Sequence, residues 1–126
     1  MENTHENRIA YRGLLFTTGD IEKYISGAIV YDETARDKLK DGTNVVDYLR
    51  SKGIAVGIKV DKGMIPLAGT NDETLTFGLE GLEKRCAEYY AMGIRFAKWR
   101  ATLRIGNGLP SDISVKETAH SLARYG

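Results

Sequence analysis

The sequence has almost no cysteine and almost no net charge. Cys86 is the only cysteine among 126 residues, which excludes an internal disulfide framework and a cysteine-cluster metal site, and favours a reducing compartment. Lys and Arg number 18 against 17 Asp and Glu, so the formal charge is +1. Without a field of one sign, the chain is not expected to bind nucleic acid or an anionic membrane through its overall charge. Any charge-based function must therefore be local.

Long hydrophobic runs are also absent. No stretch approaches the roughly 18 apolar residues of a membrane span, and Met1–Thr4 has neither the basic nor the apolar part of a secretory signal. We therefore expect a cytoplasmic protein that is neither secreted nor membrane-spanning. The chain stops directly after a helical pattern, at Ala123–Gly126, which we interpret as the end of a truncated piece.

What is present is the composition of one ordinary globular domain, with 42% hydrophobic and 28% charged residues. Apolar runs rich in β-branched residues predict strands, the first of them covered on both faces. Helical spacing between these runs predicts helices, with Asn3 and Glu6 as a capping box for the first, Asn44 as a later cap, and Gly53 and Gly93 as helix ends. The predicted strands are 25–31, 54–61 and 94–100, and the predicted helices are 4–16, 45–52, 79–92 and a last one opened by Pro110 and Ser111.

This alternation of helices and strands indicates an α/β protein built from βαβ units with a parallel sheet. Two architectures fit it, a doubly wound open sheet and a segment of a β/α barrel. No Gly-x-Gly-x-x-Gly follows any predicted strand, and residues 105–110 lack the Gly-Lys-Ser/Thr ending of a phosphate-binding P-loop. The nucleotide-binding folds are therefore less favoured.

Charged side chains lie inside two of the predicted strands. Strand side chains alternate in direction, so Lys59 and Asp61 project from one face, and Lys98 and Arg100 share a face in the same way. Because helices cover the outer face of a parallel sheet, these charges are expected on the other face, near the carboxyl ends of the strands. Two lysines and an arginine there would form an anion pocket. The simpler alternative is a set of rim salt bridges or solvent-directed charges, although two strands with the same arrangement weaken it.

Other residue types indicate structural roles. Cys86 is expected on a buried helix stripe rather than as a nucleophile, and Trp99 under a helix. His5 and His120 have no acidic or cysteine partner at metal-ligand spacing, so surface or capping roles are expected. The cluster 71–73 indicates loop chemistry, with an oxygen-ligand metal loop left open. The last helix is expected to bury a stripe of Val115, Ala119 and Leu122.

Short motifs along nearly the whole chain resemble class I fructose-bisphosphate aldolase. They are Glu2–Arg8, Gly57–Gly63 (Gly-Ile-Lys-Val-Asp-Lys-Gly), Pro66–Thr70, Gly78–Leu82, Arg85-Cys86, Phe96–Arg100 (Phe-Ala-Lys-Trp-Arg) and Leu122–Tyr125. The resemblance implies that residues 1–126 are part of one (β/α)8 TIM barrel, supplying about strands two to four with flanking helices. It also implies that Lys59 and Lys98 are catalytic and bind substrate, that Arg8 and Arg100 bind substrate, and that Asp61 is a possible charge partner of Lys59.

The implied activity is that of a glycolytic lyase. Such an enzyme reversibly cleaves fructose 1,6-bisphosphate to dihydroxyacetone phosphate and glyceraldehyde 3-phosphate through a lysine Schiff base, without a metal or other cofactor, usually as a homotetramer. The family's first strand, with its catalytic aspartate, and its Schiff-base lysine have no counterpart in these 126 residues, so the chain alone is expected to be inactive. Two alternatives stay open: a non-catalytic phosphate-binding or assembly module, and a different barrel lyase or isomerase.

Overall fold

The computed structural model describes residues 2–126, and the chain divides into two compact units. Each unit uses two separate stretches of sequence. The first consists of residues up to Lys59 together with Lys84–Lys98, and the second of Val60–Glu83 together with Trp99–Gly126. Among the described residues, no helix is long and apolar enough to cross a membrane.

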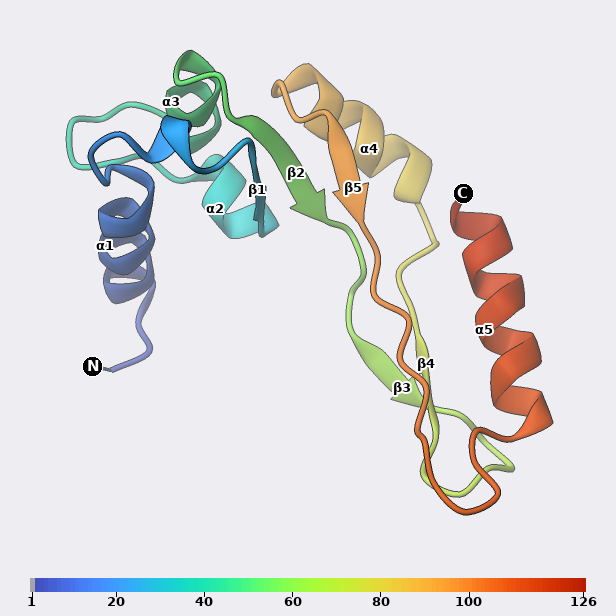
Figure 1. Cartoon of the computed structure of the whole chain (residues 1–126). Coiled ribbons are helices and arrows are strands. Elements are labelled where there is room, and N and C mark those ends of the chain that lie inside the picture. The colour runs from blue at the N-terminus through green and yellow to red at the C-terminus, as the bar shows by residue number, and fades with distance from the viewer. Residues whose placement is uncertain (1) are drawn as a thin grey trace. The chain divides into compact units, whose positions relative to one another are not determined.

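A three-stranded parallel sheet forms the centre of the first unit (Figure 1). Its strands are β1 (Gly27–Val30), β2 (Ala55–Lys59) and β5 (Phe96–Lys98), in the order β1-β2-β5. The predicted parallel sheet is confirmed. Each strand is shorter than its predicted range, because only the residues that pair with a neighbouring strand belong to the sheet. The sheet is open, and residues 2–126 contain no closed barrel.

Helices precede and separate these strands, as the hydrophobic pattern predicts. They are α1 (His5–Phe16), the short 3-10 helix η1 (Ile21–Lys23), α2 (Asp32–Arg36), α3 (Val45–Ser51) and α4 (Leu82–Ala91). The sequence pattern missed η1 and α2, which are only 3 and 5 residues long. Helices this short carry no readable hydrophobic period.

The helix caps were predicted with mixed success. Asn44 caps α3 as expected, since its side chain accepts hydrogen bonds from the backbone N–H groups of Val46 and Asp47. The predicted capping box of Asn3 and Glu6 is wrong: Thr4 is the cap of α1, and its side chain accepts from the Asn7 N–H at 3.2 Å. The Asn3 side chain instead accepts from Arg8 Nη1 at 2.9 Å.

One face of the sheet carries the core of the first unit. Val56 and Ile58 of β2 are buried and lie beside α3, which contributes Val46 and Leu49. The opposite face is largely open among the described residues, because Ile29 is 52% exposed. The expectation that strand 25–31 is covered on both faces is therefore wrong for this structure.

The second unit contains an antiparallel hairpin and the last helix (Figure 1). The hairpin strands β3 (Met64–Pro66) and β4 (Thr74–Thr76) were not predicted, because three residues are too few to show alternation. Helix α5 (Asp112–Tyr125) begins after Ser111, whose side chain accepts from the Ser114 N–H.

Helix α5 buries a different stripe from the predicted one. Its buried residues are Ser114, Thr118 and Ser121, whereas Val115 is 44% and Leu122 is 42% exposed. The helix packs against β4 in this unit. Small hydroxyl side chains allow such close packing, so the contact selects them over the larger apolar residues that the hydrophobic pattern favours.

Candidate active site

Lys59 and Lys98 lie opposite each other at the carboxyl ends of neighbouring strands. Each is the last residue of its strand, and the pairing register of β2 and β5 places them side by side. Paired residues on adjacent parallel strands point to the same face and lie about 5 Å apart at their backbones. The structure thus brings together the two lysines in the way that strand alternation predicted.

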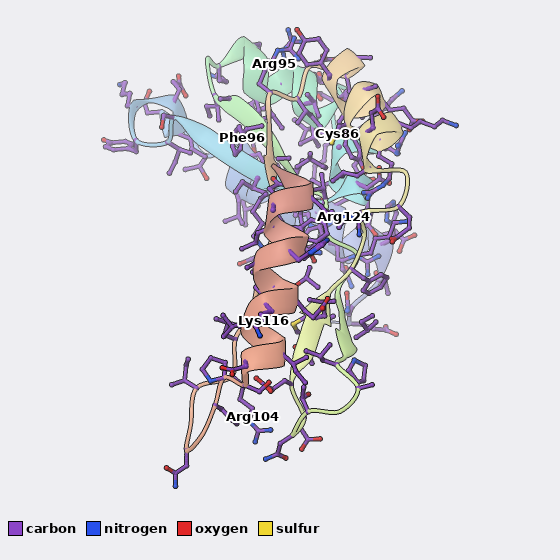
Figure 2. The ribbon with its side chains drawn as sticks, turned by 90° about the vertical axis from the view of Figure 1, so that its right-hand side faces the viewer. Cys86, Arg95, Phe96, Arg104, Lys116 and Arg124 are labelled. Atoms are coloured by element: carbon purple, nitrogen blue, oxygen red, sulfur yellow. The ribbon has the colours of Figure 1, made fainter. Side chains whose placement is uncertain are left out.

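The same face contains an aromatic floor. Phe96 begins β5 (Figure 2) and is paired in register with Gly57 of β2. A Cβ atom built on Gly57 would collide with the Phe96 ring, and one built on Gly27 would touch it. The ring therefore lies over both glycines. Phe96 and Gly57 each stand two residues before the lysine of their own strand, so they share its face.

Tyr31 holds the Lys59 ammonium group beside this floor. It directly follows β1, and the Lys59 Nζ atom lies 5.7 Å from the centre of its ring. A cation at that distance over an aromatic face is attracted by the ring quadrupole. A second cation contacts the same ring: the Cζ atom of Arg12, on α1, lies 5.7 Å from the ring centre. The ring is thus shared by two cations.

Arg8 of α1 makes a bidentate ion pair with Glu33 of α2. Arg8 Nε and Nη2 donate to the two Glu33 carboxylate oxygens at 2.9 and 2.8 Å. Arg12 Nη1 donates to the same carboxylate at 2.6 Å. These contacts, that of Arg8 first, lower the pKa of Glu33 to about 2, and the Glu33 contact raises the pKa of Arg8. Glu33 is therefore ionised at every pH near neutrality.

These contacts connect two of the predicted site residues within the first unit. Arg8 binds Glu33, Glu33 binds Arg12, Arg12 lies over Tyr31, and Tyr31 lies under Lys59. Sequence reasoning missed Glu33, Arg12 and Tyr31. The one available signal was the position of Tyr31, two residues after Ile29 and hence on the same strand face.

Arg100 and Asp61 belong to the second unit, where each has its own contacts. Arg100 follows β5 and is exposed, and its carbonyl oxygen accepts from the Thr76 hydroxyl. Asp61 is 5% exposed, and its Oδ1 accepts from the Gly63 N–H at 3.2 Å. The substrate contact of Arg100 and the pairing of Asp61 with Lys59 stay predictions.

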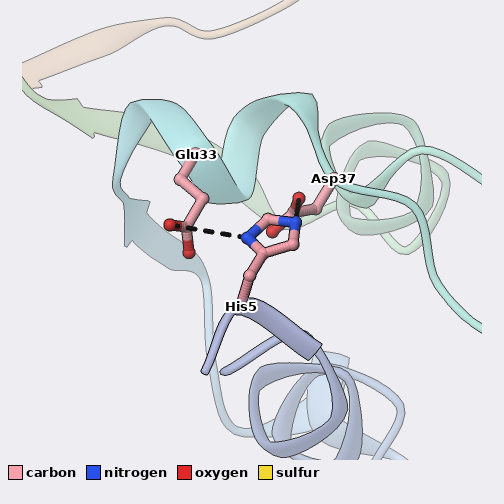
Figure 3. A group of neighbouring side chains, drawn as sticks. All are labelled: His5, Glu33 and Asp37. Atoms are coloured by element: carbon pink, nitrogen blue, oxygen red, sulfur yellow. Dashed lines mark ion pairs between the residues drawn. The ribbon is translucent and has the colours of Figure 1, made fainter. Parts of the chain in front are cut away.

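His5 has two acidic neighbours that are distant from it in the sequence. Figure 3 shows its ring between two carboxylates, with Nδ1 3.6 Å from Glu33 Oε2 and Nε2 3.4 Å from Asp37 Oδ1. Sequence spacing could not show these partners, because both come from α2 and its end, about thirty positions along the chain. His5 itself is exposed, as the sequence predicts. Burial raises the pKa of Asp37, whose side chain is only 9% exposed.

The ligand types of His5, Glu33 and Asp37 could hold a divalent cation, since one ligand atom of each lies within 4.8 Å of the others. However, both Glu33 oxygens already accept from guanidinium groups. A metal ion would have to displace two like-charged arginines. The cluster is therefore better described as an ion-pair network than as a metal centre.

The remaining sequence candidates have structural roles in the described residues. Cys86 lies on α4 (Figure 2) and borders a cavity of about 170 Å³ lined mainly by apolar and aromatic side chains. Trp99 stacks on Tyr125 of α5, with ring centres 5.2 Å apart, as a residue packed under a helix should. In the cluster 71–73, a Glu73 carboxylate oxygen accepts from the Ser111 N–H at 3.0 Å, and His120 is exposed on α5.

Comparisons with known proteins agree with the motifs. The family model described as "Fructose-bisphosphate aldolase class-I" (Glycolytic) matches residues 1–126. A probable class 1 fructose-bisphosphate aldolase of Xanthomonas campestris is 55% identical over 125 residues, which are 99% of this chain and 37% of that protein. The cytoplasmic isozyme of Spinacia oleracea is 53% identical over 126 residues, which are 100% of this chain and 35% of that protein.

A solved structure agrees as well. The fructose-bisphosphate aldolase of Plasmodium falciparum, in complex with TRAP and a small-molecule inhibitor, superimposes with a TM-score of 0.95 and 50% identity. The match covers 99% of this chain and 37% of the other. This chain thus spans little more than a third of the relatives it matches. On the matched residues and the shared fold, the chain belongs to the class I fructose-bisphosphate aldolase family.

Proposed function

We propose that the protein to which these residues belong is a glycolytic aldol lyase. It reversibly cleaves fructose 1,6-bisphosphate to dihydroxyacetone phosphate and glyceraldehyde 3-phosphate through a lysine Schiff base. The observation that carries this proposal is the pairing of Lys59 with Lys98 at the carboxyl ends of two parallel strands, on a face with an aromatic floor. Chemistry gathers at that end of the strands in β/α barrels.

Within this proposal the sheet β1-β2-β5 supplies about strands two to four of a (β/α)8 barrel, with its open face turned inward. The high structural similarity to an aldolase supports the placement. Lys59 and Lys98 are catalytic and contact the substrate, and Arg8 and Arg100 bind its phosphate groups. The Schiff-base lysine comes from a part of the family's sequence that these 126 residues do not match.

The chemical task of the two lysines follows from the reaction. A lysine amine adds to the substrate ketone and expels water, and the resulting iminium draws the electrons of the breaking carbon–carbon bond. The proton of the substrate hydroxyl must leave at the same time. Ammonium groups beside the reacting carbons stabilise the developing negative charge and favour the neutral form of the nucleophilic amine.

The first experiment measures cleavage of fructose 1,6-bisphosphate by the full-length protein with and without a chelator. Because a Schiff base needs no metal, we expect the same rate in both. Loss of the rate on chelation would contradict the metal-free mechanism. Lys98→Met is expected to lower kcat by at least about a hundredfold, because it removes a cation that stabilises the transition state.

The second experiment treats the 126-residue chain with borohydride and dihydroxyacetone phosphate. We expect no covalent adduct, and an adduct on Lys59 or Lys98 would reassign the nucleophile. Calorimetry of the same chain with fructose 1,6-bisphosphate tests the alternative of a non-catalytic phosphate-binding module. Tight binding together with an inactive full-length protein would favour that alternative.

We further propose a cytoplasmic homotetramer. Relatives named as cytoplasmic or cytosolic isozymes support the location. Sedimentation of the full-length protein checks the assembly, and a monomer at micromolar concentration would contradict it.

A further inference from the structure

We propose that Glu33 is a positioning residue for substrate phosphate, acting through Arg8. Glu33 holds one edge of the Arg8 guanidinium group and thereby directs the opposite edge toward an incoming phosphate. The inference rests on the proposed function, because it gives Arg8 a phosphate to bind. It concerns a carboxylate that itself touches neither substrate nor reacting atoms.

The hydrogen-bond donors of Arg8 divide between two edges. A guanidinium group offers five N–H donors in a fixed plane. The edge formed by Nε and Nη2 is fully engaged, because each nitrogen donates to one Glu33 oxygen in a fork-to-fork pair. Within residues 2–126, the hydrogen bonds of the other edge, formed by Nη1 and the second Nη2 hydrogen, go to the exposed Asn3. Nη1 donates to its side-chain oxygen at 2.9 Å and to its backbone carbonyl oxygen at 3.3 Å.

Asn3 is a weak partner that a phosphate can replace. It is exposed and stands just before the cap of α1, so its contacts compete with water. A phosphate dianion carries the charge opposite to the guanidinium group and can accept two parallel hydrogen bonds from it, which makes it a stronger partner than the neutral Asn3 amide. The Nη1/Nη2 edge is therefore the one that a phosphate would take, while Glu33 keeps the other.

Glu33 itself is held in place by a second arginine. Arg12 donates to Glu33 Oε1 at 2.6 Å, and its side chain is only 22% exposed. The same guanidinium lies over the Tyr31 ring, which Lys59 also approaches. Glu33 thus fixes Arg8 relative to the carboxyl ends of β1 and β2, where Tyr31 and Lys59 lie. The pair of Glu33 and Arg8 is part of this network and not an isolated surface contact.

An opposite interpretation makes a different prediction. If Glu33 occupied Arg8 in place of phosphate, removing its charge would release the arginine and strengthen phosphate binding. If Glu33 positions Arg8, removing its charge frees the side chain to move, and phosphate binding weakens. The sign of the change in KM distinguishes the two.

The test compares Glu33→Gln with wild type in the full-length protein, with fructose 1,6-bisphosphate as substrate. Activity of the wild type is established first, so that failure of the proposed function is seen separately. We expect Glu33→Gln to raise KM about tenfold and to leave kcat within about twofold, because the lost contact serves binding in ground and transition state alike. A KM that is unchanged or lower would overturn the inference.

The matched control is Asp32→Asn. Asp32 is the neighbouring residue on α2, and it pairs with Arg36 instead of Arg8. The substitution changes net charge by the same amount, and we expect KM and kcat to stay at wild-type values. An equal rise in KM in this control would show that the effect is one of overall charge and would overturn the inference.

Arg8→Ala then tests whether Glu33 acts through Arg8. In that background Glu33→Gln should cause no further rise in KM, because the group that it positions is already gone. A further tenfold rise would overturn the inference. Asn3→Ala is an independent check that does not disturb Glu33: KM should stay the same or fall, and a large rise would show that the Asn3 edge is not the phosphate edge.

Discussion

At the scale of single residues, Gly57 determines where the aromatic floor of the sheet can lie. Its missing side chain leaves the space that the Phe96 ring fills. Gly57→Ala should lower the free energy of unfolding by about 2 kcal/mol, because overpacking a closed contact displaces the ring and the backbone beside it. Chemical denaturation of the full-length protein measures this loss.

Gly13→Ala is the matched control for that prediction. A Cβ atom at Gly13 would meet only Leu39, at an ordinary 3.6 Å, and the residue lies inside α1. The same substitution there should stabilise the protein by up to about 1 kcal/mol, since alanine favours a helix over glycine. Equal effects at the two positions would contradict the role given to Phe96.

Asp37 gives a prediction for the pH dependence of stability. Its pKa in the folded protein is raised above 3.8, first of all by burial, while His5, Arg12 and Arg8 lower it and Glu33 raises it further. The folded state therefore holds this proton more tightly than the unfolded chain does, and stability falls as pH rises from 3.8 through the raised pKa. Asp37→Asn should therefore raise the free energy of unfolding, relative to wild type, by more at pH 7 than at pH 3.5.

Asp32→Asn is expected to do the opposite. Hydrogen bonds from Arg36 lower the pKa of Asp32, so its contribution is present at neutral pH and is lost as pH falls below 3.8. The variant should lose stability at pH 7 and little at low pH. Denaturation curves of both variants at the two pH values check this, and shifts of the same sign would contradict the assignments.

At the scale of elements, Asn44 joins two helices. Its side-chain oxygen Oδ1 caps α3 by accepting from the Val46 N–H, and its Nδ2 donates to the backbone carbonyls of Ala35 and Asp37 at 3.1 and 3.3 Å. Asn44→Ala should cost about 2 kcal/mol of unfolding free energy, at the upper end for a cap, because it removes both sets of contacts. Asn71→Ala, in an exposed loop, should change it by less than about 0.5 kcal/mol.

The same element scale shows where the sequence pattern is informative. Three of the helix ends marked by local chemistry are as the sequence predicts: the Asn44 cap and the glycines at 53 and 93, which have φ values of 73° and 94°. The cap of α1 differs, because Thr4 takes the place expected of Asn3. The β3–β4 hairpin was missed because each strand has only 3 residues. The buried stripe of α5 was predicted wrongly because contact with β4 favours small side chains over apolar ones.

At the scale of the whole chain, the parallel sheet has two open edges, β1 and β5. Its uncovered face exposes Ile29 by 52% and Phe96 by 39%. The 126-residue chain by itself should therefore bind a hydrophobic dye and associate as its concentration rises, because unpaired edges and exposed apolar faces recruit partners. The full-length protein should bind less dye per molecule. Sedimentation and dye fluorescence measure both, and a dye-free monomer would contradict the expectation.

The sequence by itself determined the parallel α/β order and the sheet face that Lys59 and Lys98 share, while the register that pairs them came from the structure. Both depend on local rules, since the strand period is two and neighbouring parallel strands end at one edge. Only the tertiary structure decided the partners of Arg8 and His5, because Glu33 lies 25 residues beyond Arg8 and no periodicity reaches that far. The alternation of strand side chains indicates the shared face of Lys59 and Lys98, whereas the contact of Glu33 with Arg8 depends on how α1 packs beside α2.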